Sequence, residues 1–292
     1  MTERLTLARA FDESWRVWRR QLTKCRAHAK PKAVHELRVT SRRLAALLDV
    51  LGRVAFSHHK GHRKQSDRLA AVVDTVLHHL SSLRDAQVQH QRVRAAAARH
   101  AGLEELAHHL ARRETHRKDR VRRALRKLGL GEARNAAARL RRELKQTPEP
   151  SPTAVRRAVD ARFTAVRRRV ARLEPSKPDS IHRLRIAVKQ FRYTAEIAAS
   201  LSPLRLRHRP AIRTLQDQMG EAHDADLLIE RAEKFRRSSK SGAMDGAGDA
   251  SAALIRALER ERDRRVARVT ATTPGVDHWW PPAPPGRRAG DA

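Results

Sequence analysis

The apolar residues of this chain return every three or four positions, and this spacing restricts the fold to packed helices. Near the N-terminus the series runs through Ala8, Phe11, Trp15, Trp18, Leu22 and Cys25, which places all of them on one helix face. Ala and Leu are abundant, whereas Gly and β-branched residues are sparse within such segments, as is typical of helices. The sequence therefore predicts an all-α protein.

Breaks between the apolar stripes set the expected helix boundaries. Lys30-Pro31 ends the first helix, and Ser81-Ser82 predicts a bend between the third and fourth helices. Three prolines within residues 147–152 stop any helix and predict the boundary between two halves. Helices are expected at 2–29, 32–54, a segment carrying Leu69 to Leu80, 84–99, 103–128, a short segment ending at Lys145, 153–173, 180–201, 209–219, 224–237 and 252–269.

These boundaries predict four regions. Residues 1–146 form the first helical half and residues 153–237 the second. Residues 238–271 comprise a flexible linker, rich in Ser, Gly and Ala at its start, and a C-terminal helix. Residues 272–292 are expected to be a disordered Pro-rich tail, in which Trp279-Trp280 either serves as a docking peptide or has no specific role.

The charge of the chain predicts a polyanionic partner. Lys and Arg number 64 against 32 Asp and Glu, a formal net charge of +32, and a compact body with this excess repels itself. The planar donor fork of Arg matches phosphate oxygens. Aromatic residues make up only 3% of the chain, so a ladder of rings for stacking single-stranded nucleic acid is not expected.

Two further features bear on the cellular compartment. Cys25 is the only cysteine, which excludes an intrachain disulfide and suits a reducing compartment. The N-terminal stretch is charged rather than apolar, and no run approaches the length of a membrane span. We therefore expect a cytoplasmic protein that is neither exported nor embedded in a membrane.

A pattern of basic residues occurs twice in the chain. His35-x-x-Arg38-Val39-x-x-x-Arg42 returns 147 residues later as His182-x-x-Arg185-Ile186-x-x-x-Lys189. At about 100° per residue, the His and the two following cations share one helix face, opposite an apolar face. A solvated helix face explains a single copy, but it would mix its signs and tolerate any polar residue. The recurrence of one spacing favours an anion that spans both copies.

A second element also recurs after each stripe. Leu80-Ser81-Ser82-Leu83-Arg84-Asp85-Ala86 in the first half corresponds to a segment of the second half that ends in His223-Asp224-Ala225. Each Asp either caps the helix that follows or orients a neighbouring Arg.

These motifs, together with Arg192-Tyr193-x-x-Glu196 and Leu215-Gln216-Asp217-x-Met219-Gly220, resemble the CHAD family, the conserved-histidine α-helical domain, over roughly residues 5–237. The resemblance implies two pseudo-symmetric antiparallel four-helix bundles around a basic central groove that binds inorganic polyphosphate without turnover. It implies that the groove is lined by His35, Arg38, Arg42, Arg43, Arg84, His182, Arg185, Lys189, Arg192 and Arg213. Structural or orienting roles are expected for Asp85, Tyr193, Glu196 and Asp224.

Motifs that would indicate catalysis or cofactor binding are not found. The nearest match to a Glu-x-Glu-x-Lys triphosphatase signature is Glu259-Arg260-Glu261-Arg262-Asp263, which has Asp in place of Lys and a helical pattern. The His-rich positions, among them His58, His59, His62, His78-His79 and His108-His109, lack the carboxylate or thiolate company of a divalent metal site. We expect no enzyme activity, no cofactor and no metal.

The expected partner is inorganic polyphosphate, with polyphosphate granules as an associated surface. The alternatives are a non-specific nucleic-acid-binding protein or a basic scaffold for acidic proteins, and nucleic acid is expected only as a weak competitor. A shortage of aromatic residues and of base-reading motifs disfavours specific nucleic-acid recognition.

Overall fold

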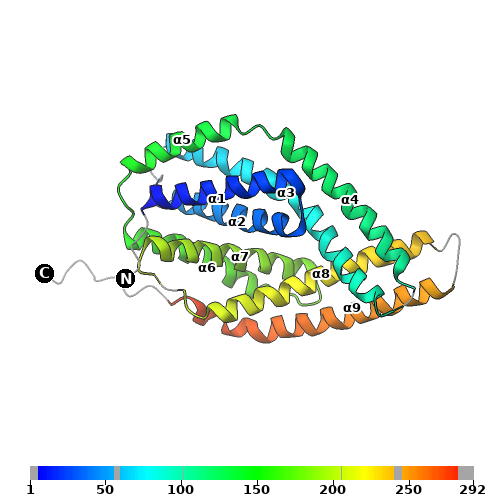
Figure 1. Ribbon diagram of the computed structural model, residues 1–292. Helices are drawn as coiled ribbons and strands as arrows, with labels where there is room; N and C mark the ends of the chain where they lie inside the picture. The colour runs from blue at the N-terminus through cyan, green and yellow to red at the C-terminus, as the bar shows by residue number, and fades with distance from the viewer. Residues whose placement is uncertain (1–5, 56–59, 101, 205, 240–244, 282–292) are drawn as a thin grey trace.

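The computed structural model describes residues 6–55, 60–100, 102–204, 206–239 and 245–281, and the regular secondary structure in these ranges is helical throughout (Figure 1). This confirms the all-α prediction. The elements are α1 (Leu7–His28), α2 (Pro31–Val54), α3 (Lys60–Ala97), α4 (Glu104–Lys127), α5 (Gly131–Gln146), α6 (Pro152–Val170), α7 (Pro178–Leu201), α8 (Arg209–Ser239), α9 (Asp245–Thr272) and the 3-10 helix η1 (Thr273–Trp279).

Local signals explain where several helices begin. The hydroxyl of Thr6 caps α1 by accepting from Arg9 N at 3.3 Å, and that of Ser151 caps α6 by accepting from Ala154 N at 3.2 Å. Proline occupies the first turn of α2, α6 and α7, where its missing N–H has no helical partner to lose. Between α1 and α2, Ala29 adopts a left-handed conformation with φ 45°. The predicted break at Lys30-Pro31 is therefore confirmed.

Two predicted breaks are wrong, because α3 and α8 continue through them. In α3 the Ser81 hydroxyl donates back to Leu77 O at 2.9 Å, so the serine fits inside the helix. In α8 the chain remains helical through Gly220, and Met219 and Ala222 on either side of it are buried. Each helix continues because its apolar stripe extends past the residue expected to break it and packs against neighbouring helices on both sides of that residue.

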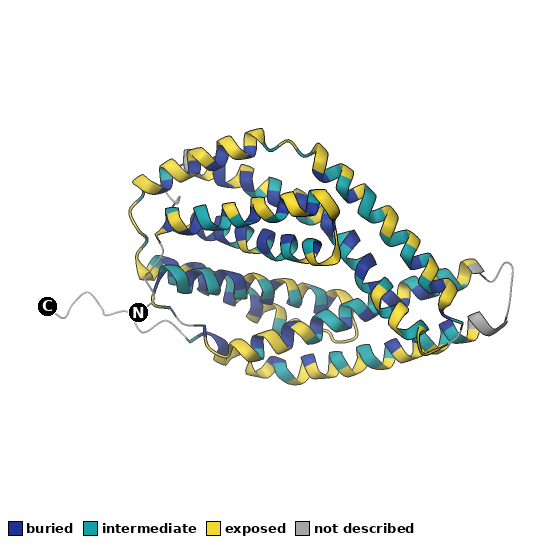
Figure 2. Ribbon diagram, viewed as in Figure 1, coloured by how far each residue is buried: buried dark blue, intermediate teal, exposed yellow. Residues whose placement is uncertain are grey.

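Buried apolar residues in the described part of the chain gather in three clusters. The first joins α1, α2, the first part of α3, the end of α4 and α5. The second joins α6, α7, the first part of α8, the end of α9 and η1. The third lies where the end of α3 and the start of α4 meet the end of α8 and the start of α9. Exposed residues gather on the outer sides of α4, α5 and α9 (Figure 2).

The two halves of the chain meet along α2 and α7. Helix α2 packs against both α7 and α6, and α3 packs against α8. Figure 1 shows α2 of the first half lying beside α7 of the second, while the long helices α3 and α8 converge at the far end of the molecule. The basic faces of the two halves are thereby brought together. The pseudo-symmetry of two four-helix bundles stays a prediction.

The C-terminal region departs from the prediction of a linker and a disordered tail. Helix α8 extends to Ser239, and α9 already begins at Asp245, inside the expected linker. The chain then forms η1, and Trp279 and Trp280 are only 2% and 4% exposed within the second cluster. Burial of two indole rings stabilises order where the Pro-rich composition alone predicts none. Residues 282–292 lie outside the described residues.

Trp280 is fastened by polar contacts as well as by packing. Its Nε1 donates to Asp160 Oδ1 at 2.5 Å, and the Arg156 guanidinium lies 5.1 Å from the ring centroid. Arg156 also donates to the carbonyl oxygen of Pro281. These contacts fix the end of the described chain to α6.

We expect Trp280→Ala to lower the free energy of unfolding by about 3–5 kcal/mol, because it leaves a large cavity in the second cluster. Thermal and urea unfolding will measure the loss. Asp277→Asn is the control, since Asp277 is exposed and forms only a surface pair with Arg167. Equal stabilities of Trp280→Ala and the unmodified protein would contradict docking of this segment.

Candidate functional site

A cavity of about 900 Å³ lies between the two halves, and we call it the central cavity. It is lined by α2 and α3 of the first half and by α6, α7 and His223 of α8 in the second. Its titratable lining is mainly basic, with seven Lys and Arg against four Asp. The basic residues are Arg38, Arg42, Arg53, Arg63, Arg162, Arg185 and Lys189, and the acidic ones are Asp49, Asp67, Asp74 and Asp85.

The centre of the lining consists of one cationic pair from each half. We call Arg38 and Arg42 the α2 pair, and Arg185 and Lys189 the α7 pair; both pairs line the central cavity. Each pair has i, i+4 spacing, so both cations project from one helix face. The opposite faces are fully buried, with Leu37 on α2 and Leu184 on α7 packed in the first and second clusters. The apolar cores therefore turn both pairs toward each other.

Burial and mutual repulsion perturb these cations. Burial first, and then repulsion from Arg185, Arg42 and Arg38, lower the pKa of Lys189 to about 6. Burial also lowers the pKa of Arg38 to about 10, with Arg42 as the next cause. The pKa of Arg185 falls for the same first reason. Since cations of α2 act on cations of α7, the two halves share one electrostatic site that is short of negative charge.

Two carboxylates balance part of this charge. Burial raises the pKa of Asp85 and of Asp224, while Arg38 and Arg185 respectively oppose the rise most strongly. Asp85 raises the pKa of Arg38 and of Arg185, and Asp224 raises the pKa of Arg185, of Lys189 and of Asp85. Both residues lie in the interior of continuous helices, α3 and α8, so neither caps a helix. The capping alternative is excluded by this placement.

Neighbouring groups hold the arginines of the cavity in position. Arg38 Nη1 donates to Ser81 Oγ at 3.0 Å, so the serine that fails to bend α3 instead anchors the α2 pair. Gly220 of α8 leaves room beside Arg185, since a Cβ built there would lie 3.9 Å from Arg185 Nε. That Nε is buried and has no hydrogen-bond partner among the described residues. A buried donor of this kind is available to an anion.

Two histidines, His182 and His223, lie next to the α7 pair. The rings of His182 and His223 lie 4.7 Å apart between centroids, and both side chains line the central cavity. Burial lowers the pKa of His223 to about 4, with Arg185 as the next cause, and burial likewise lowers the pKa of His182. Both imidazoles are therefore neutral hydrogen-bonding groups near neutral pH.

Comparison with known proteins identifies the family. A family model described as the CHAD domain matches residues 9–233. The chain belongs to the CHAD family. No curated protein matches the chain.

Solved structures agree with this CHAD fold. The crystal structure of the CHAD domain from the plant Ricinus communis is similar with a TM-score of 0.62 at 17% identity, covering 94% of this chain and 93% of that one. PptA from Streptomyces chartreusis is similar with a TM-score of 0.62 at 16% identity, covering 91% of this chain and 97% of that one. At such identities the likeness concerns the fold.

The structure brings half of the sequence-predicted binding residues to the central cavity of this CHAD domain. Arg38, Arg42, His182, Arg185 and Lys189 line it. Five do not: His35, Arg43 and Arg213 are exposed elsewhere, and Arg84 and Arg192 are half-buried outside the lining.

The positions of Arg84 and Arg192 have specific causes. Arg84 lies close enough to Asp85 and Asp224 to lower the pKa of both. Arg192 Nη1 pairs with Glu196 Oε1 at 3.1 Å, and its guanidinium covers the Tyr193 ring at 4.5 Å. Tyr193 itself is buried and lines the cavity. The expected orienting residues Glu196 and Tyr193 thus hold Arg192 away from the cavity rather than directing it inward.

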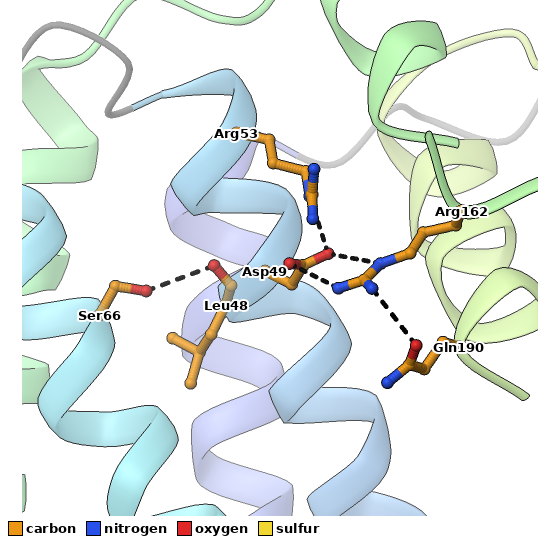
Figure 3. Close-up of polar contacts among 6 residues, drawn as sticks. All are labelled: Leu48, Asp49, Arg53, Ser66, Arg162 and Gln190. Carbon is orange, nitrogen blue, oxygen red and sulfur yellow. Dashed lines mark hydrogen bonds and ion pairs between the residues drawn. The ribbon is translucent and has the colours of Figure 1, made fainter. Parts of the chain in front are cut away.

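Sequence reasoning missed two basic residues of the cavity lining, Arg53 and Arg162. Arg162 of α6 forms a forked ion pair with Asp49 of α2, and Arg53 pairs with the same carboxylate (Figure 3). Arg53 follows Asp49 by four residues, so it could have been predicted by extending the basic stripe of α2 one more helical turn. Arg162 is one of many arginines in α6 and carries no motif, so only tertiary contact distinguishes it.

Neither a metal centre nor a membrane-spanning helix is found in the part of the chain that the structure describes. No group of three or more His, Cys, Asp or Glu side chains there is placed to hold a metal ion, and His58 and His59 lie outside the described residues. No described helix is both long and apolar enough to cross a membrane.

The perturbed Lys189 predicts a gain of stability on its removal. Replacing a buried, repelled cation by an apolar side chain is commonly stabilising, so we expect Lys189→Met to raise the free energy of unfolding by about 1–4 kcal/mol. The pKa of about 6 lies below the ordinary 10.5, so the folded state binds fewer protons than the unfolded state between these values. Stability of the unmodified protein therefore rises with pH across this window, and the advantage of the variant shrinks.

Thermal unfolding at about pH 6 and about pH 9 tests the sign of this linkage. Lys24→Met is the control, because Lys24 is exposed on α1. A Lys189→Met protein that is less stable than the unmodified one near pH 6 would assign Lys189 a structural role.

Proposed function

We propose that this CHAD domain binds inorganic polyphosphate in the central cavity and does not turn it over. The observation that carries the proposal is the meeting of the α2 pair and the α7 pair, from opposite halves, in one cavity with incomplete charge balance. Folding brings three arginines and Lys189 together there at a cost to stability, and Lys189, whose pKa is about 6, is largely neutral near neutral pH until an anion binds beside it. A polyanion offsets that cost, because it supplies the missing negative charge.

The chemistry of the lining suits a linear chain of phosphates. Each phosphate group offers charge and acceptor oxygens, which the guanidinium forks of Arg38, Arg42 and Arg185 can bind in parallel. The low-dielectric walls strengthen these interactions relative to an open surface. Neutral His182 and His223 add hydrogen-bonding groups beside the α7 pair.

Binding without catalysis is the second part of the proposal. Asp85, which lines the cavity, and Asp224, which does not, lie among the arginines whose charge they balance. This placement suits positioning of the cations for an anion rather than activation of a water molecule. The chain as a whole has a formal net charge of +32. This charge further favours association with polyphosphate granules, and it attracts nucleic acid more weakly.

A competition titration tests the proposal. Labelled long-chain polyphosphate is bound to the protein and displaced by unlabelled polyphosphate or by single- and double-stranded DNA at equal phosphate concentration. We expect polyphosphate to displace the label at least about tenfold more effectively, because DNA phosphates carry bulky nucleosides into a confined cavity. Equal displacement by DNA would favour the nucleic-acid alternative, and shortening of the polyphosphate during incubation with Mg²⁺ would refute binding without turnover.

A further inference from the structure

Asp49 of α2 is the acidic residue at the cavity that is held by two arginines at once. Arg162 Nη2 lies 2.7 Å from Asp49 Oδ1 and Arg162 Nε donates to Oδ2 at 3.1 Å, so the guanidinium grips the carboxylate with both arms of its fork. Arg53 Nε donates to the same Oδ2 at 3.1 Å. Figure 3 shows both arginines directed at Asp49, Arg53 from above on the same helix and Arg162 from the neighbouring half. Asp49, Arg53 and Arg162 all line the central cavity.

This geometry is that of an anion-binding site whose anion is part of the protein. A guanidinium binds a carboxylate and a phosphate through the same parallel pair of N–H donors. Gln190 of α7 accepts from Arg162 Nη1 at 3.3 Å, so this hydrogen bond holds the guanidinium without using the Nε and Nη2 donors that contact Asp49. The Asp49 and Arg162 side chains are 26% and 23% exposed, so an anion from solvent can reach the pair.

The position along α2 places this anion site in line with the α2 pair. Asp49 follows Arg42 by seven residues, two helical turns, so both lie on one face about 10 Å apart along the axis. A chain of phosphates that leaves the α2 and α7 pairs along the cavity therefore reaches Arg53 and Arg162. The phosphate chain brings more negative charge to these arginines than the single Asp49 carboxylate does. This difference favours replacement of Asp49 by phosphate.

We propose that Arg53 and Arg162 form an outer phosphate subsite of the central cavity, and that Asp49 occupies this subsite as an internal counter-ion until polyphosphate displaces it. This inference rests on the proposed function. It assigns Asp49 a negative effect on affinity: the carboxylate competes with the incoming phosphate. It also makes Arg162, which comes from α6 and belongs to neither repeat, a residue that selects chains long enough to extend beyond the two pairs.

The second half of the chain supplies an informative contrast. Glu196 follows His182 by fourteen residues, as Asp49 follows His35, and it also holds an arginine, Arg192. That pair lies outside the cavity lining. Freeing Arg192 therefore exposes no subsite, whereas freeing Arg53 and Arg162 does.

The main test is the affinity of Asp49→Asn for long-chain polyphosphate, measured by isothermal titration beside two charge-matched variants. Asp67→Asn removes a cavity carboxylate that forms no recorded ion pair among the described residues, and Glu196→Gln frees an arginine outside the cavity. We expect Asp49→Asn to bind about tenfold more tightly than the unmodified protein, and both controls to change by about threefold or less.

A double-mutant cycle and a second single variant keep the subsite testable even if Asp49→Asn disturbs the fold. In the Arg162→Gln background, Asp49→Asn should retain only the small gain of the charge controls, because the subsite is gone. Arg53→Gln, which leaves the Asp49–Arg162 bridge between the halves intact, should weaken binding several-fold relative to Arg20→Gln on α1.

The outcomes separate this inference from the function on which it rests. If the unmodified protein fails to bind polyphosphate, the proposed function itself is refuted. If it binds, but Asp49→Asn gains no more than Asp67→Asn or loses affinity together with thermal stability, Asp49 is a structural clamp between α2 and α6 and the subsite is refuted.

Discussion

Removing both cationic pairs together, by Arg38→Ala, Arg42→Ala, Arg185→Ala and Lys189→Ala in one chain, will weaken long-chain polyphosphate binding by on the order of a thousandfold or more. A thousandfold loss corresponds to about 4 kcal/mol, which four charge-assisted contacts can supply even when their contributions overlap. Helix content should persist in circular dichroism, because all four side chains lie opposite the buried faces of α2 and α7.

The variants that lose only one pair carry the sharper information. If the two halves bind one chain, the contact with the second pair is effectively intramolecular, so losing either pair should cost a large part of the affinity. Exposed cations of α1 provide the control: Arg16, Arg19, Arg20 and Lys24, all replaced by Ala, remove the same charge without touching the cavity. A loss of affinity in that control equal to the loss in the cavity variant would indicate general surface attraction. A dispensable pair would show that the halves do not share a site.

The second large effect expected is on salt dependence. With about six to eight phosphates neutralised, affinity should fall on the order of a thousandfold over a fourfold rise in salt concentration, by analogy with nucleic acids. The seven basic residues of the cavity lining are of the number required. The slope of log affinity against log salt should become shallower by about three in the four-residue cavity variant. A nearly flat response in the unmodified protein would contradict a multi-phosphate site.

The sequence predicted which cations share a helix face because helix geometry is local. Arg38 and Arg42, like Arg185 and Lys189, must share a face at i, i+4 spacing in any helix, and the leucines opposite them decide which face turns inward. The predicted breaks at Ser81 and Gly220 were wrong for the converse reason. Serine and glycine weaken a helix by a small local amount, which packing of α3 and α8 along their length outweighs.

Equivalent positions in the two copies of the repeat have different surroundings in the tertiary structure. His182 lines the cavity against His223 of α8, whereas His35 is exposed. The shared spacing fixes each side chain's direction on its own helix but not which other helix stands in front of it. Arg43 and Arg213 are outside the lining for the same reason.

The sequence by itself determined the all-helical class, the faces that are buried and the cations that lie opposite them, because these depend on periodicities of a few residues. Only the tertiary structure decided that the α2 and α7 pairs meet, that Arg162 joins Asp49 across the cavity, and that Trp279 and Trp280 pack into the second cluster. The first two of these bring together residues more than a hundred positions apart, and their energy depends on burial and charge that exist only once distant helices have packed together.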